Sequence, residues 1–118
     1  MSLRRLPHYL RLHRKKVGLS QDDVASLLGA RSGTKVSRYE RFARTPTLET
    51  ALACEVIFGV PVAEIFAGLI ERAERAVILR AETLLERLVK DPRTERHPGR
   101  QAFLKRISSL LDSLHETG

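Results

Sequence analysis

The 118-residue chain lacks long apolar runs and carries a single cysteine, Cys54. One cysteine excludes an intramolecular disulfide, which is typical of proteins kept in a reducing compartment. No apolar stretch reaches the length of about 18 residues that a transmembrane helix needs. The basic start of the chain also lacks the apolar core of a signal peptide. We therefore expect a soluble, cytoplasmic protein in which Cys54 is a small core residue.

The sequence also lacks the patterns of strands, repeats and catalytic sites. No alternation of apolar and polar residues is long enough for a strand, and neither low-complexity tracts nor internal repeats occur. The histidines show no metal-ligand spacing with Cys54 or with carboxylates, and the glutamates form no recognisable acid and base pair. The histidines are His8, His13, His97 and His115. We expect an all-α protein that is not an enzyme and uses no metal and no cofactor.

The chain has an excess of positive charge. Its net charge is +7, from 21 Lys or Arg against 14 Asp or Glu. Residues 1–67 hold eleven of the cations and six of the anions, a net charge of +5. Residues 68–118 hold ten and eight, a net charge of +2. A basic surface favours a polyanionic partner, so we expect an anion-binding face in the first half of the chain.

The first two helices are predicted from a proline, two glycines and a serine. Pro7 fits a first helical turn, and the apolar spacing continues until Gly18 offers a stop. Ser20 is suited to cap the second helix, which Gly29 ends. The apolar positions are Leu6, Leu10, His13 and Val17 in the first helix and Val24, Leu27 and Leu28 in the second.

The third helix, expected over about residues 33–42, has two different sides. Ser32 or Thr34 is suited to cap its start. Val36, Tyr39 and Ala43 fall within about 60° of one another at helical spacing, so we expect them to face the core. Hydroxyl and guanidinium groups then lie on the outer side of this helix.

The next two helices follow from similar signals. Thr47 is suited to cap a fourth helix that runs to about Phe58 and stops at Gly59. The stretch "GVPVAEIF" predicts a short fifth helix that carries Ile65 and Phe66.

The second and third helices together match the physical needs of a helix-turn-helix that reads DNA. The second helix holds the third at a fixed angle, and the third helix is narrow enough to enter the major groove. The guanidinium of Arg38 is suited to donate two hydrogen bonds to guanine, and Ser or Thr hydroxyls can donate to or accept from base edges.

At this point the sequence resembles a known family. The stretch "GLSQDDVASLLGARSGTKVSRYERFARTPTLETALACEVIFGVPVAEIF", residues 18–66, is similar to the phage-repressor-like, or XRE/Cro-type, helix-turn-helix family. The similarity covers about residues 6–67 and is carried by "GLSQ", "VSRYE", "TPTLETALA" and "FGVPVAEIF" taken together. It implies a five-helix, lambda-repressor-like DNA-binding domain over residues 1–67.

The resemblance also implies roles for individual residues. Base contacts are expected from Thr34, Lys35, Ser37 and Arg38. Phosphate contacts are expected from Gln21, Arg41 and Arg44, and a structural ion pair from Arg14 and Glu40. The turn before Val36 is one residue longer than the usual pattern, with Gly33 where the family commonly places a contacting side chain. A glycine there lets the backbone approach a phosphate closely, so we also expect a phosphate contact at Gly33.

The second half, residues 68–118, is expected to form a helical hairpin. A long amphipathic helix is predicted from Leu69 to about Lys90, with its apolar side at Ile70, Ala73, Val77, Ala81, Leu84, Leu85 and Leu88. A polar, basic connector follows Asp91, and a last helix is marked by Phe103, Ile107, Leu110, Leu111 and Leu114. We expect this hairpin to need a partner to bury its apolar faces, either the fourth helix of the same chain or a second chain.

These features predict a sequence-specific transcriptional regulator that binds double-stranded DNA. We expect a homodimer on a palindromic operator, acting as a repressor, because two modules about 34 Å apart reach neighbouring major grooves. One alternative is a DNA-binding antitoxin whose hairpin captures a protein partner. Another is an interaction adaptor that keeps the fold without reading DNA.

Overall fold

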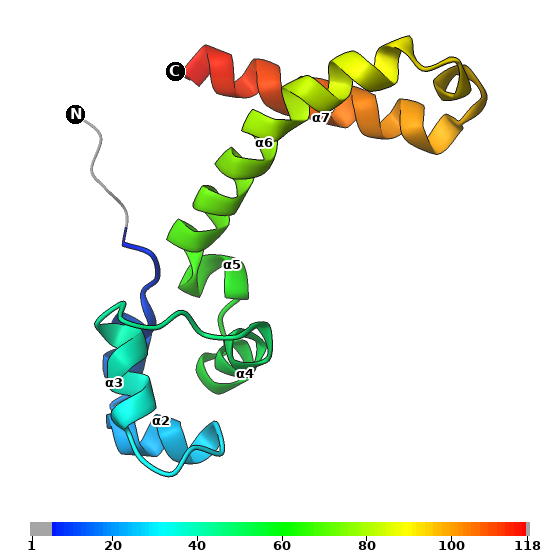
Figure 1. Cartoon of the computed structure of the whole chain (residues 1–118). Helices are drawn as coiled ribbons and strands as arrows, with labels where there is room; N and C mark the ends of the chain where they lie inside the picture. Colours follow the sequence, from blue (N-terminus) through cyan, green and yellow to red (C-terminus); the bar gives the residue numbers. More distant parts are fainter. Residues whose placement is uncertain (1–5, 118) are drawn as a thin grey trace. The chain divides into compact units, whose positions relative to one another are not determined.

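The computed structural model describes the backbone of residues 6–117 and the side chains of residues 6–113. Over this range the chain is helical and has no strand, which confirms the all-α prediction (Figure 1). The elements are α1 (Leu10–Lys16), α2 (Gln21–Leu27), α3 (Thr34–Glu40), α4 (Leu48–Phe58), α5 (Val62–Ile65), α6 (Ala67–Lys90), the 3-10 helix η1 (Pro92–Arg96) and α7 (Pro98–Thr117). The chain divides into two compact units, Met1–Glu71 and Arg72–Gly118.

Helix α1 begins at Leu10, so the prediction that Pro7 lies in its first turn is wrong. The residues just before it are not helical, and they bond to a later part of the first unit. The Pro7 carbonyl accepts a hydrogen bond from Leu69 N at 2.9 Å, and Tyr9 N donates to the Ile65 carbonyl at 2.8 Å. Leu6 lies outside the helix and is exposed, and Val17 at the other end is exposed as well.

Helices α2 and α4 have the predicted caps. Ser20 and Asp23 form a capping box at the start of α2, which satisfies two backbone N–H groups reciprocally. Thr47 caps α4 by accepting from Thr50 N, and Gly59 ends it with a φ of 66°. These start and stop signals are therefore confirmed.

The buried side of α2 differs from the prediction at one position. Val24 is buried as expected, but Leu27 is 60% exposed and Ala25 is buried in its place. Val24 and Ala25 pack with Val36 of α3, which sets the face that α2 turns inward.

Helix α3 is shorter than expected and has no side-chain cap. Its N-cap is Gly33, so the prediction that Ser32 or Thr34 caps it is wrong. It ends at Glu40 because Phe42 adopts a φ of 61° and the chain reverses there. Ala43 N then donates to the Arg38 carbonyl at 2.9 Å, which places Ala43 outside the helix and in solvent. The expectation that Ala43 is buried is therefore wrong.

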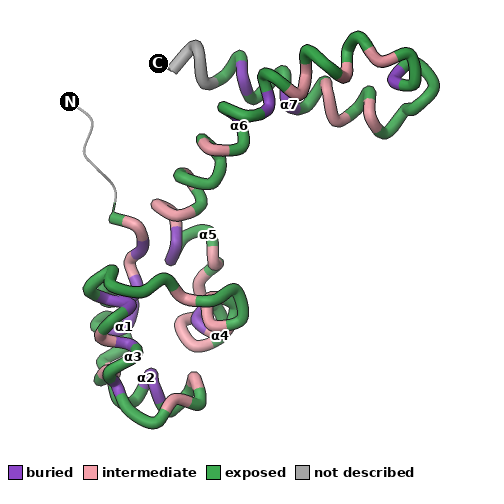
Figure 2. Tube along the Cα trace, viewed as in Figure 1, coloured by how far each residue is buried: buried purple, intermediate pink, exposed green. Residues whose placement is uncertain are grey.

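The first unit has two neighbouring apolar clusters. One contains the buried residues Leu10, Tyr39, Cys54, Ile65 and Phe66, and the other contains Val24, Ala25 and Val36. Figure 2 shows buried positions on α1, α2 and α3 in this unit. Burial raises the pKa of the Cys54 thiol to about 11, so it stays protonated as a core residue. These clusters hold α3 against α1 and α2, which positions its outer face.

The second unit encloses a small core of its own. Ile78 and Ala81 of α6 pack with Ile107 and Leu111 of α7, and Leu85 and Phe103 lie against them. The expected apolar side of α6 is only partly used, since Ala73 and Val77 are exposed. The side chains of Leu114 and His115 lie outside the described residues.

The connector between α6 and α7 is ordered. Asp91 caps η1 by accepting from Arg93 N at 2.9 Å, and its carboxylate also accepts from the Arg93 and Arg100 side chains. Gln101 Nε2 donates to the carbonyls of Thr94 and Glu95. Over residues 6–117, no helix is both long enough and apolar enough to cross a membrane.

Candidate nucleic-acid interface

A buried ion pair joins α1 to the end of α3. Arg14 Nε donates to Glu40 Oε2 at 2.6 Å, and Arg14 Nη2 donates to Glu40 Oε1 at 3.0 Å. Arg14 Nη1 donates to the Leu19 carbonyl at 2.9 Å. Gln21 Nε2, at the start of α2, donates to Glu40 Oε1 at 3.1 Å. One carboxylate thus ties together the three helices that form the helix-turn-helix region.

The electrostatics of this network favour the charged pair. Burial acts to raise the pKa of Glu40, but hydrogen bonds from Arg14 and Gln21 outweigh it and hold that pKa below its ordinary value. The hydrogen bond to Glu40 also raises the pKa of Arg14. Both groups therefore remain ionised, and their orientation fixes the end of α3.

Gly33 lies against the start of α2. Its N–H donates to Asp22 Oδ1 at 2.7 Å. A Cβ atom at this position would lie 2.8 Å from Asp22 Oδ1, 3.0 Å from Gln21 Cβ and 3.1 Å from Asp22 N. The φ of Gly33 is −70°, which any residue adopts, so glycine is needed here for close approach between α2 and α3.

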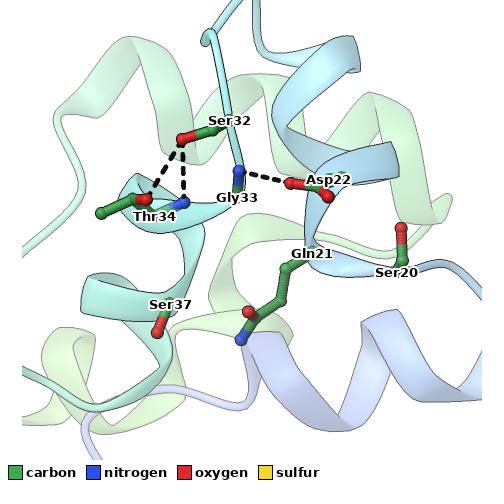
Figure 3. A pocket seen from close by; sticks show the side chains of 7 residues that line it. All are labelled: Ser20, Gln21, Asp22, Ser32, Gly33, Thr34 and Ser37. Carbon is green, nitrogen blue, oxygen red and sulfur yellow. Dashed lines mark hydrogen bonds between the residues drawn. The ribbon is translucent and has the colours of Figure 1, made fainter.

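A hydroxyl-rich hollow of about 510 Å³ lies at this junction (Figure 3). It is lined by Ser20, Gln21, Asp22, Ser32, Gly33, Thr34 and Ser37. In Figure 3 the Gly33 N–H is directed at the Asp22 carboxylate, and Ser32 Oγ donates to Thr34 Oγ1 at 3.1 Å beside it. Hydroxyl and amide groups of this kind can donate to phosphate oxygens or to base edges.

The residues expected to contact bases lie on the outer side of α3. Thr34, Lys35 and Arg38 are exposed, and Ser37 is half-buried. Val36, which lies between them in sequence, and Tyr39, which follows Arg38, are fully buried. This spacing of buried and exposed residues leaves one ammonium, one guanidinium and two hydroxyls on the helix face that is open to a partner.

The residues expected to contact phosphates are more dispersed. Arg41 and Arg44 follow α3 and are exposed, and Arg41 Nε donates to the Ser37 carbonyl at 3.4 Å. Gln21 uses one amide hydrogen for Glu40, which leaves the second hydrogen of the same nitrogen for another acceptor. The N–H of Gly33 donates to Asp22, and the expected phosphate contact at Gly33 stays a prediction.

Comparison with known protein families decides the class of this module. Residues 5–67, more than half of the chain, match a family described as a helix-turn-helix domain. The chain belongs to this helix-turn-helix family. Helix-turn-helix domains bind double-stranded DNA by placing their second helix in the major groove. Neither the comparison with curated proteins nor that with solved structures gave a match.

Two residues of the helix-turn-helix region, Asp22 and Phe42, make contacts that the sequence did not predict. Asp22 reads in sequence as a carboxylate in the first turn of a helix, but it holds the N–H of Gly33. Phe42 has positive φ and packs against His8, with ring centroids 5.0 Å apart. A phenylalanine carries no sequence signal for positive φ, so only the structure locates the end of α3.

Proposed function

We propose that this helix-turn-helix protein is a sequence-specific transcriptional regulator of the phage-repressor-like type that represses by occupying its operator. The observation that carries the proposal is the outer face of α3, which is polar and cationic while its inner face is fully buried. A reading helix must be held rigidly, and the bonds from Arg14 and Gln21 to Glu40 support that. Residues 1–67 would form the DNA-binding domain in the cytoplasm.

The proposed base contacts come from Thr34, Lys35, Ser37 and Arg38. Arg38 is exposed and would donate two hydrogen bonds to the O6 and N7 of guanine. Lys35 would donate to a guanine acceptor in the same groove. Thr34 and Ser37 carry hydroxyls at the rim of the hollow beside Gln21, where they would meet base edges near the start of α3.

The proposed phosphate contacts come from Gln21, Gly33, Arg41 and Arg44. Gln21 would use its second amide hydrogen, so that its bond to Glu40 orients it toward the backbone of DNA. Arg41 and Arg44 lie at the opposite end of α3 and are exposed. Contacts at both ends would set the register of the helix in the groove and make binding depend on salt.

We propose a homodimer on a palindromic operator, with residues 68–118 as the dimerisation element. Ile70, Ala73 and Val77 follow one another at helical spacing along α6 and are exposed. An uncovered apolar stripe of this spacing suits pairing with the same stripe of a second chain. A dimer would place two reading helices on neighbouring major grooves.

Selection from random DNA duplexes, using the full chain at moderate salt, tests this proposal. We expect the selected sequences to contain an inverted repeat whose halves are about one helical turn apart. Failure to enrich any motif would favour an interaction adaptor instead. Enrichment of a single half-site would support DNA reading and contradict the dimer.

Val77→Glu tests the dimer separately, with Val89→Glu as its matched control. Val89 is also exposed on α6 but lies off the stripe. We expect Val77→Glu to convert the protein to a monomer in light scattering and Val89→Glu to leave it dimeric. Equal effects of the two substitutions would contradict the assignment of the stripe.

A further inference from the structure

A second hollow lies on the first unit and shares no lining residue with the hydroxyl-rich hollow. Its volume is about 490 Å³. It lies beside α1 and the end of α3, and it is lined by Leu6, His8, Tyr9, Arg11, Leu12, Lys15, Glu40 and Phe42. The proposed DNA contacts use none of these residues.

The hollow gathers large apolar side chains that remain exposed. Leu6 is 48% exposed, Leu12 is 51% exposed and Phe42 is 44% exposed. Single exposed apolar residues are common on protein surfaces, but a group of them around one concavity is typical of a binding site. The apolar part of a ligand would lie against these three side chains.

The charge of the hollow is positive. Arg11 and Lys15 stand one turn apart on α1, and both are exposed. The acidic residue that lines the hollow is Glu40, whose two oxygens accept hydrogen bonds from Arg14 and Gln21. The charge of Glu40 is therefore matched by Arg14, and Arg11 and Lys15 leave the hollow with an excess of positive charge.

A buried polar group and an unusual backbone conformation lie at the same place. His8 is 3% exposed and packs against the rings of Phe42 and Phe66. Leu10 N donates to His8 Nδ1, so Nε2 carries the hydrogen of the neutral ring. Nε2 is buried and has no hydrogen-bond partner among the described residues.

Phe42 covers this ring with a φ of 61°, which is rare for a residue other than glycine. Such backbone outliers cluster at ligand clamps and switch regions.

We propose that this hollow binds an amphipathic organic anion, a carboxylate that carries an aliphatic or aromatic group. The apolar group would pack against Leu6, Leu12 and Phe42, and the carboxylate would pair with Arg11 and Lys15. A bound anion would contact the last residue of α3 and the residue that reverses the chain after it. The ligand site does not depend on whether α3 reads DNA.

The test is an NMR titration of the full chain with octanoate, with octylammonium as the probe of opposite charge. We expect octanoate to shift the amide signals of residues 8–15 and 40–42 along one saturable curve, and octylammonium to shift them little. Equal binding of both probes, or octanoate shifts spread evenly over the chain, would overturn the proposal.

Two pairs of variants assign the site. Leu12→Asp is matched by Leu52→Asp on α4, because each leucine is 51% exposed and Leu52 lies outside the hollow. Lys15→Glu is matched by Lys16→Glu, since Lys16 is the next residue on α1 and does not line it.

We expect Leu12→Asp and Lys15→Glu each to weaken octanoate binding by about tenfold or more, and the matched controls to leave it unchanged. Circular dichroism at the titration temperature is the control for whether each variant is folded. Should Leu52→Asp or Lys16→Glu weaken binding as much as its partner, octanoate binds elsewhere and the proposal fails.

Discussion

The carboxylate of Glu40, the last residue of α3, receives two hydrogen bonds from the guanidinium of Arg14 on α1. The two residues are 26 positions apart in sequence, and both are buried. A third bond, from Gln21, links the same carboxylate to α2. The proposed reading helix is thus held at its end by charge, while Val36 and Tyr39 hold its inner face by apolar packing.

Glu40→Gln should destabilise the protein by about 3 kcal/mol, because it leaves the Arg14 guanidinium buried without its counter-charge. Urea denaturation of the full chain measures this change. Glu49→Gln, at an exposed position in the first turn of α4, should cost about 0.5 kcal/mol. The combined Arg14→Leu and Glu40→Leu variant should be more stable than either single leucine variant. If Glu40→Gln costs no more than Glu49→Gln, the pair does not hold α3.

Gly33→Ala should destabilise the protein by about 1 to 3 kcal/mol through overpacking. The new Cβ would meet Gln21 Cβ at 3.0 Å and Asp22 N at 3.1 Å. Adding Asp22→Ala should not restore stability, since both of these atoms remain. Thermal denaturation compares the variants. A stabilised Gly33→Ala protein would show that α2 and α3 do not approach closely here.

Stability should fall as the pH drops through the range in which the unfolded chain protonates His8. Burial lowers the pKa of His8 below its ordinary value of 6.5, against the opposing effects of the Tyr39 backbone and Glu40. The unfolded state therefore binds the proton more readily. The stability that neutral His8 contributes is present above pH 6.5 and is lost as the pH falls below it. His8→Asn keeps a side-chain acceptor for Leu10 N and cannot titrate.

Free energies of unfolding measured from about pH 7.5 to about pH 5.5 test this prediction. We expect the wild-type value to decline toward the acidic end and the His8→Asn value to decline less. Parallel pH profiles for the two proteins would mean that His8 is not the group responsible.

Asp91→Asn should loosen the turn between α6 and α7. Hydrogen bonds from the Arg93 side chain and backbone hold the pKa of Asp91 well below its usual range. The stability that ionised Asp91 contributes is thus present above the ordinary aspartate pKa and is lost only in stronger acid. In hydrogen exchange near neutral pH, the amides of Arg93 and Thr94 should exchange faster in Asp91→Asn. Asp112→Asn, an exposed position on α7, should leave them unchanged, and protection that survives Asp91→Asn would contradict this role.

Local capping chemistry was sufficient to predict several elements. Ser20 and Thr47 mark the starts of α2 and α4 because each accepts a hydrogen bond from a backbone N–H three residues later. Gly59 marks the end of α4 because it adopts a positive φ. The start of α1 could not be predicted in this way. Pro7 and Tyr9 bond to Leu69 and Ile65, and contacts between such distant residues leave no local pattern.

The outer face of α3 was also predictable, because the spacing of Val36 and Tyr39 decides which side is buried. The end of α3 was not, since Phe42 has positive φ without being glycine and thereby removes Ala43 from the helix. The ion pair between Arg14 and Glu40 was expected only from the family resemblance, because helical spacing cannot relate residues so far apart.

The most direct test of the account is a comparison of the affinities of the wild-type protein and two variants for a selected and a scrambled duplex. Fluorescence anisotropy at about 0.15 M salt measures them. We expect the wild-type protein to bind the selected duplex about 10³-fold more tightly than the scrambled one. Arg38→Ala should lose about 1 to 3 kcal/mol on the selected duplex alone, and Arg41→Ala should weaken binding to both alike. Equal affinity of the wild-type protein for the two duplexes would contradict the claim that α3 reads DNA sequence.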